Sequence, residues 1–348
     1  MKRATKWGVI ILGLAWIAGA SGIRAASPAD MPGVPSRSFE FHVVVHVPAL
    51  PAGNHELRIW MPLPYEERYQ VISNVKIESP VRYRIYHESE YNNRYAYMVV
   101  DADKVKTPFD ITLSFHAQRL EHRVALVPSG GSGGSFLVST QRFLQPDRLV
   151  PIDGQIGELS DHETQGALEP LDKVRKIYDY VIASMHYDHD GNQWGRGDAL
   201  WACDSHHGNC TDFHSLFIGM VRAQSIPARF EIGFQIPPSV HQAAITSYHC
   251  WAQFYIDSIG WIPIDASEAW KQKHLHDYYF GSIDQNRVMF SMGRDIRLNP
   301  PQQGDPLSYF VYPYAELDGK AFSGLTNDYF FLDAGASAAE KNSAAGGR

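Results

Sequence analysis

The residue best suited to nucleophilic chemistry is Cys210, which lies in the segment HHGNCTDFHSLFIGMVRAQSIPAR (residues 206–229). The spacing i, i+3, i+4, i+7, i+8 of the apolar residues that follow predicts an amphipathic helix. These residues are Phe213, Leu216, Phe217, Met220 and Val221. Asn209 is a favoured N-cap and Asp212 can reach back to its amide, so Cys210 falls in the first turn. There a thiol pKa can fall from about 8.5 to roughly 3.5–7.5, which makes the thiolate a nucleophile, and neighbouring amides can hold an oxyanion.

A thiolate nucleophile needs a proton carrier, and His249 is the histidine with an acid partner on predicted rigid structure. His249 begins the predicted strand HCWAQFYI, and Asp265 ends the predicted strand GWIPID after the turn DSIG. The two residues are an even number of positions apart, so both side chains face one side if Gly260 takes a positive φ in an odd-length loop. A carboxylate beside the imidazole would fix its tautomer and stabilise its charged form. The residues therefore predict a Cys, His, Asp triad.

The elements that must carry these residues follow an α+β pattern. Stretches of period two between residues 36 and 125 predict an N-terminal antiparallel β-sandwich-like domain; they are FEFHVVVHV, HELRIWMPLP, VRYRIYHES, RYAYMVV and FDITLSFHA. PSGGSGGS predicts a flexible joint. A helix over EPLDKVRKIYDYVIASM, the helix behind Cys210 and the strands RFEIGFQI, HCWAQFYI and GWIPIDA predict a second domain over residues 140–300. Residues 301–332 are expected to form a C-terminal extension and residues 333–348 a disordered tail.

Three ordered motifs resemble the transglutaminase-like superfamily. GNCTDFHSLFIGMVRAQSIPARFEIGF is similar to its nucleophile segment, and HCWAQFYIDSIGWIPIDAS is similar to its His-x-Trp and Gly-Trp-x-Pro-x-Asp strands. The resemblance covers roughly residues 171–267. It implies a papain-like core in which Cys210 is the nucleophile, His249 the general base and acid, and Asp265 the orienting acid. The β-rich region, with RIWMPLP followed by Gln70 and Val71, is similar to the domain that often precedes bacterial members.

We therefore expect a thiol enzyme that acts on peptide or carboxamide bonds in a protein or peptide substrate, because the superfamily contains peptidases, amidases and protein cross-linkers. Hydrolysis is favoured over cross-linking, since it needs only water, whereas amine transfer needs a second cleft that excludes water. A non-catalytic binding or assembly module of the cell envelope is the alternative from another class, because the superfamily also has members without catalysis. No cofactor is expected, and no loop has the spacing of a known calcium site.

The start of the chain predicts export. Three basic residues precede an uncharged run over residues 7–23, and small residues up to position 26 suit cleavage, so residues 1–26 are interpreted as a signal peptide. An uncleaved membrane anchor is the competing interpretation, since about 17 residues reach the lower limit for a span. We expect a periplasmic or secreted protein with no stable membrane span after removal of the signal. The net charge of -7, without a basic stripe, argues against a nucleic-acid partner.

Two tryptophans are candidate site residues. Trp201 and Trp251 could wall a substrate cleft, and Trp201 could also lie at the oxyanion site. The alternative is that both belong to the hydrophobic core. The segment DYYFGSIDQNRVMFSMGRDIRL, which follows the motifs, carries no chemistry that we can assign.

The other cysteines leave three arrangements open. Cys203 and Cys250 could form a disulfide in an oxidising compartment, since Cys250 points away from the His249 face of its strand. Both could equally remain unpaired and buried. The cluster CDSHHGNC offers a zinc alternative through Cys203, His206, His207 and Cys210, but its spacing matches no usual zinc finger. We therefore expect no metal site.

Overall fold

The computed structural model describes residues 33–126 and 140–335. Its strands are β1 (Ser36–Val47), β2 (Glu56–Pro62), β3 (Gln70–Glu78), β4 (Tyr83–His87), β5 (Arg94–Asp101), β6 (Phe109–Leu120), β7 (His122–Arg123), β8 (His186–Tyr187), β9 (His207–Gly208), β10 (Ala228–Gln235), β11 (Gln242–Ile245), β12 (His249–Ile256), β13 (Gly260–Ile264), β14 (Ser282–Ile283), β15 (Arg287–Met292), β16 (Tyr314–Leu317), β17 (Lys320–Ala321) and β18 (Thr326–Asp333). Its helices are α1 (Gly154–Glu163), α2 (Pro170–Ser184), α3 (Ala199–Ser205), α4 (Cys210–Ala223), α5 (Ala266–Lys271) and the 3-10 helices η2 (Gln141–Leu144) and η3 (Lys273–Leu275).

No helix in the described ranges is long and apolar enough to cross a membrane. The predicted signal peptide and the whole Gly/Ser joint lie outside the described residues, and so does most of the predicted tail.

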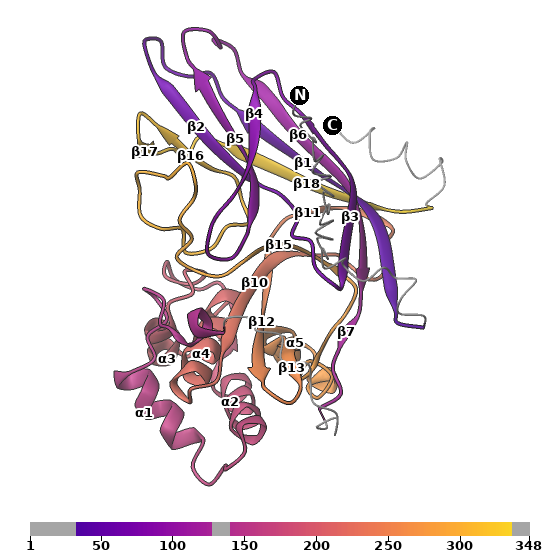
Figure 1. Ribbon diagram of the computed structural model, residues 1–348, viewed down its shortest axis with the longest axis vertical. Coiled ribbons are helices and arrows are strands. Elements are labelled where there is room, and N and C mark those ends of the chain that lie inside the picture. The colour runs from indigo at the N-terminus through magenta and orange to yellow at the C-terminus, as the bar shows by residue number, and fades with distance from the viewer. Residues whose placement is uncertain (1–32, 127–139, 336–348) are drawn as a thin grey trace, which may run out of the picture.

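Two five-stranded sheets form the β-rich part of the molecule (Figure 1). Their strand orders are β11-β18-β1-β6-β3 and β17-β16-β2-β5-β4, with antiparallel pairing throughout. The alternation predicted for β1 is confirmed, because every second residue from Phe39 to Val47 is buried. We did not predict β3, whose ladder with β6 is interrupted by a bulge between Ser73 and Lys76. Asn74, at the bulge, has a φ of 54°.

A smaller antiparallel sheet, ordered β13-β12-β10-β15, carries the predicted second domain. Helix α4 packs on β10 and β12, and α1, α2 and α3 pack around α4 (Figure 1). Because α4 is enclosed in this way, all its residues from Cys210 to Arg222 are buried, including the polar ones between the apolar positions. The predicted α+β class and the helices α2 and α4 are therefore confirmed.

The domain boundaries drawn from the sequence need correction. Residues 301–332 do not form a separate extension, because β16, β17 and β18 complete the two sheets of the N-terminal region. Strand β11, from within the predicted catalytic domain, also joins the N-terminal region by pairing with β18. The part of the chain between β7 and β16 is thus an insertion in the β-rich N-terminal region. One strand of this insertion, β11, pairs with β18 and so belongs to a sheet of that region.

Polar and aromatic contacts hold the inserted part against the sandwich. The buried Gln70 side chain donates from Nε2 to the Met289 carbonyl at 2.9 Å and accepts the Met289 N–H at 2.8 Å, which ties the start of β3 to β15. Phe41 of β1 lies 5.5 Å from Phe234 of β10 and 5.8 Å from Phe290 of β15, measured between ring centroids. Such contacts fix the small sheet relative to the sandwich.

Candidate active site

The local sequence places Cys210 at the first turn of α4. The Asn209 side chain accepts the Thr211 N–H at 2.9 Å, and the Asp212 carboxylate accepts the Asn209 N–H at 3.0 Å, which is the predicted capping box. Gly208 precedes the cap with a φ of 142°, and a Cβ there would lie 2.5 Å from the Asp212 carboxylate. Only glycine fits this approach, so the GNC motif fixes the position of the thiol.

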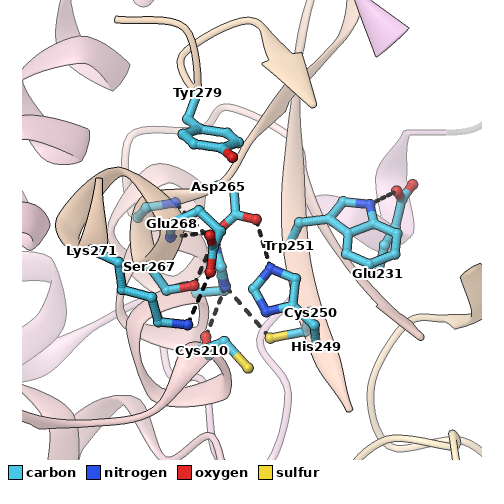
Figure 2. Close-up of polar contacts among 12 residues, drawn as sticks. Cys210, Glu231, His249, Cys250, Trp251, Asp265, Ser267, Glu268, Lys271 and Tyr279 are labelled. Carbon is cyan, nitrogen blue, oxygen red and sulfur yellow. Dashed lines mark hydrogen bonds and ion pairs between the residues drawn. The ribbon is translucent and has the colours of Figure 1, made fainter. Parts of the chain in front are cut away.

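The hairpin β12–β13 brings His249 and Asp265 together. Ile256 pairs with Gly260, which has a φ of 101°, so the hairpin meets the condition of an odd-length loop with a positive φ at Gly260. His249 Nε2 donates to Asp265 Oδ2 at 2.7 Å (Figure 2). The two side chains therefore share one side of the sheet, as their even separation requires.

Asp265 has three further hydrogen-bond partners besides His249. Arg287 Nη1 donates to Oδ2 at 3.0 Å, while the Ser267 hydroxyl and the Glu268 N–H each donate to Oδ1 at 3.0 Å. Burial alone would raise the pKa of this fully buried carboxyl, but the charges and hydrogen bonds of His249 and Arg287 lower it far below its usual range. Asp265 is therefore a fixed anion, and it also caps α5 through the Glu268 N–H.

Cys210 and His249 shift each other toward the charged forms. Burial opposes charge on both, but hydrogen bonds from Cys250 and His249 and the imidazolium charge hold the pKa of the Cys210 thiol well below its usual range. Against burial, the charge and hydrogen bond of Asp265, together with Cys210, raise the pKa of His249 to about 9. The electrostatics thus favour a thiolate–imidazolium pair at neutral pH.

His214 lies one turn of α4 after Cys210 and is fully buried beside the pair. Its Nδ1–H donates to the Cys210 carbonyl at 2.7 Å, and its Nε2 accepts the Ala266 N–H at 3.1 Å. These two bonds assign the neutral tautomer, which agrees with the lowered pKa that burial gives this imidazole. His214 therefore joins the start of α4 to the end of β13 without adding a charge.

The cysteines adopt the unpaired arrangement, since Cys203, Cys210 and Cys250 are all free and buried. Cys250 faces α4, as the alternation along β12 requires, and its sulfur lies 3.5 Å from His214 Nδ1. Cys203 instead lies on α3, where Gln155 Nε2 donates to its sulfur at 3.5 Å. The Cys203–Cys250 disulfide that we considered is thus not formed, because the two thiols have different surroundings.

The zinc alternative is not supported by the described residues. Cys203 contacts Gln155, His207 pairs with Asp188 and Cys210 faces His249, so these three of the four proposed ligands do not converge. No cluster of three or more candidate metal ligands occurs in residues 33–126 and 140–335.

Neither predicted tryptophan lines the cavity next to the triad. Trp251 is buried behind His249, with ring centroids 6.2 Å apart, and its indole donates to Glu231 at 2.6 Å (Figure 2). The Arg287 guanidinium lies over the Trp251 ring, 5.0 Å from its centroid. Trp201 lies half-buried on α3, where its N–H is capped by Asp198. Trp251 is therefore a buried core residue that packs near His249. Trp201 has no described contact with the triad.

A cavity of about 330 Å³ opens beside the triad. Its walls are Tyr187, the end of β10 at Gln235 with Pro237 and Pro238, residues 244–248 including the end of β11, His249 and Lys271. Two larger cavities, of about 800 and 600 Å³, are lined by none of the three triad residues. Cys210 and His249 are only 1% and 3% exposed, and His249 lines the smaller cavity, which makes that cavity the candidate entry for a substrate.

Several supporting residues had only weak signals in the sequence. His214 follows Cys210 by one helical turn, which places it on the same face of α4. Asp265 and Glu268 have the spacing of a helix start, which could have revealed α5 and hence Lys271 at its end. Arg287 comes from the segment to which we assigned no chemistry, and no local pattern links it to Asp265.

Comparisons with known proteins agree with this architecture. A sequence model of the Transglutaminase-like superfamily matches residues 158–266. An uncharacterized protein of Haemophilus influenzae is 24% identical over 321 residues, which covers 82% of this chain and 87% of that protein.

Two solved structures are also similar. A candidate cysteine protease from Cytophaga hutchinsonii superposes with a TM-score of 0.57 at 18% identity, covering 87% of this chain and 92% of that one. The periplasmic domain of TgpA from Pseudomonas aeruginosa gives a TM-score of 0.36 at 14% identity, covering 70% of this chain and 92% of that one. The segment that the Transglutaminase-like superfamily model matches spans α2, α4 and the strands β10 to β13, and it contains Cys210, His249 and Asp265.

Proposed function

We propose that this chain is an exported cysteine peptidase or amidase that hydrolyses peptide or carboxamide bonds through Cys210, His249 and Asp265. The observation that carries the proposal is the buried chain of contacts in which Cys210, at the first turn of α4, hydrogen-bonds to His249, and His249 donates to Asp265 at 2.7 Å. A merely structural cysteine in an apolar core would have its pKa raised by burial, whereas here the partners reverse that effect. The neighbour from Cytophaga hutchinsonii is named as a candidate cysteine protease, which agrees with this chemistry.

In the first half of the reaction, the Cys210 sulfur attacks the carbonyl carbon of the amide. The carbonyl oxygen becomes an oxyanion, for which the Cys210 backbone N–H is the candidate donor at the start of α4, because the N–H groups of Thr211, Asp212 and Phe213 already donate to Asn209. When the oxyanion collapses, the C–N bond breaks and the His249 imidazolium gives its proton to the departing amine. The products are a free amine and a thioester on Cys210.

In the second half, neutral His249 takes a proton from water, and the resulting hydroxide attacks the thioester carbon. The C–S bond then breaks, which releases a carboxylic acid and restores the thiolate and imidazolium. Since the first half needs protonated His249, and the pKa of that residue is about 9, we expect kcat/KM to fall as pH rises through about 9.

Export is part of the proposal because of the sequence before residue 27. The basic start, uncharged run and small residues are those of a secretory signal, which would leave the enzyme in the periplasm or outside the cell. Its substrates would then be exported proteins or peptides.

The test is a library of fluorescence-quenched peptides and glutamine-containing peptides, each incubated with and without an excess of a labelled primary amine. We expect new peptide termini or released amine, an acyl group on Cys210 after acid quenching, and little incorporated label. A dominant amine-linked product would instead assign protein cross-linking. No cleavage and no acyl group across the library, or equal activity of Cys210→Ala and the parent, would assign the non-catalytic module.

A further inference from the structure

Lys271 is the one permanently cationic side chain among the described residues that line the cavity beside His249. It ends α5, the helix that Asp265 caps, so it lies roughly 9 Å along the helix axis from the triad acid. Its side chain is 32% exposed, whereas Glu268, its ion-pair partner at 2.9 Å, is 4% exposed and lies behind it. The ammonium therefore faces the cavity and the carboxylate does not.

The rest of the cavity does not balance this charge. Its other described walls are two tyrosines, Gln235, Pro237, Pro238, residues 244–247 and His249, so no acidic side chain is among them. His249 is itself protonated while Cys210 is ionised, and that pair is internally neutral. A substrate entering the cavity thus meets the Lys271 ammonium on its wall, whereas the Glu268 carboxylate that pairs with it is buried and does not line the cavity.

The ammonium of Lys271 still has capacity for a ligand. A lysine has three N–H donors. Glu268 Oε1 accepts one at 2.9 Å, and the Tyr187 ring lies 3.9 Å from Nζ. These two contacts restrict the position of Nζ before any ligand binds. Less side-chain freedom is then lost when an anion binds, which lowers the entropic cost of binding. Both partners, with the charge of Glu268 countering burial, keep the pKa of Lys271 above its usual value.

We propose that Lys271 is a specificity-determining residue that binds a carboxylate of the substrate, so that the preferred substrates are peptides with an acidic side chain or a free carboxyl group within about three residues of the scissile bond. This proposal rests on the proposed function. The carboxylate would form a charge-assisted hydrogen bond with Nζ, and Tyr187 and Tyr248 would line the path of the peptide.

The experiment uses quenched peptides that differ at a single position, scanned over three residues on each side of the scissile bond. Each position carries Glu, Gln or Lys in turn, so that Glu and Gln differ in charge but hardly in shape. We expect one position at which kcat/KM for Glu exceeds that for Gln by about tenfold. The Lys peptide should be the poorest at that position, and the preference should weaken with added salt.

Substitutions at Lys271 then link the preference to this side chain. In Lys271→Gln the Glu/Gln ratio should fall to about one, in Lys271→Glu the Lys peptide should become the best, and Lys271→Arg should retain the preference for Glu. Lys273→Gln is the matched control, because Lys273 is exposed two residues further along and does not line the cavity. The ratio of kcat/KM for the Glu and Gln peptides is measured within one variant, so a general loss of thiol reactivity affects both values equally and leaves the ratio unchanged.

The possible failures can be told apart. If the parent cleaves the Glu and Gln peptides equally at every position, or if the preference survives Lys271→Glu, the assignment of Lys271 is overturned while the peptidase function stands. If no peptide is cleaved although iodoacetamide labels Cys210 rapidly, the proposed function itself fails. Should Lys271→Glu not fold, the parent series and Lys271→Gln decide the question.

Discussion

Two buried cysteines at neighbouring helices show how much position matters to a thiol. Cys210 opens the 14-residue helix α4, next to His249 and the amides of the first turn. Cys203 lies near the end of the seven-residue helix α3, where burial and Asp204 raise the pKa of its thiol. Both are almost inaccessible, at 1% and 8% exposure, so burial does not distinguish them. What differs is the sign of the surrounding charge, and that sign separates a candidate nucleophile from an ordinary core residue.

The largest difference between the two thiols should appear in catalysis. Cys210→Ala should lower kcat/KM on a cleaved peptide by about 10⁴-fold or more, because no other group forms the thioester. Cys203→Ala should leave it within about twofold. Equal losses in the two variants would mean that the assay reports folding and not chemistry, which circular dichroism of each variant can check.

The next effect concerns Asp265. Asp265→Asn keeps the cap of α5 but removes the anion that holds His249, so we expect kcat/KM to fall by about 10²- to 10⁴-fold, less than for Cys210→Ala. Asp284→Asn is the control, since Asp284 also pairs with Arg287, at 2.9 Å, and has no described bond to His249. If Asp284→Asn were as damaging as Asp265→Asn, the Arg287 environment would matter more than the orientation of His249.

The thiols should also differ in alkylation by iodoacetamide, without any substrate. At pH 6 we expect Cys210 to be labelled about 10²-fold faster than Cys203, as located by peptide mapping, because more of it is thiolate. His249→Ala should narrow this difference by about tenfold or more and move the Cys210 profile to higher pH, since the imidazolium that lowers its pKa is gone. A Cys210 profile that matches Cys203 in the parent would contradict the thiolate–imidazolium pair.

The smallest expected effect comes from the helix caps, and it distinguishes a loss of stability from a loss of Cys210 reactivity. Asn209 caps α4 and Asp198 caps α3, each by accepting a backbone N–H of its helix. Asn209→Ala and Asp198→Ala should each lower the free energy of unfolding by about 1 kcal/mol in urea titrations. Only Asn209→Ala should also slow labelling of Cys210. An equal change in labelling for both variants would argue that global stability, and not the local cap, controls the thiol.

The sequence was informative wherever a feature depended on neighbours along the chain. The alternation in β1, the apolar stripe and capping box of α4, and the positive φ of Gly260 depend on local geometry, and the sequence indicated each of them. They suffice to align His249 with Asp265.

What could not be predicted depends on contacts between distant segments. The pairing of β11 and β16–β18 with the N-terminal sheets leaves no local signal, since short strands pair with any edge of suitable register. Arg287 reaches Asp265 only because β15 lies beside β10. The burial of His214 also depends on how α4 meets the sheet.

The return of the last strands to the first sheet bears on how the chain acquires its fold. Arg37, at the start of β1, donates to Asp333 at the end of β18, 296 positions later. During synthesis or translocation from the N-terminus, β1 can pair with β6 early, but its other edge stays open until β18 emerges. The segment with Cys210, His249 and Asp265 is made within this interval. The candidate site can therefore form before β18 pairs with β1 and completes the sheet. Such long-range closure is slow, and a chain cut before β18 would keep an unpaired strand edge prone to association.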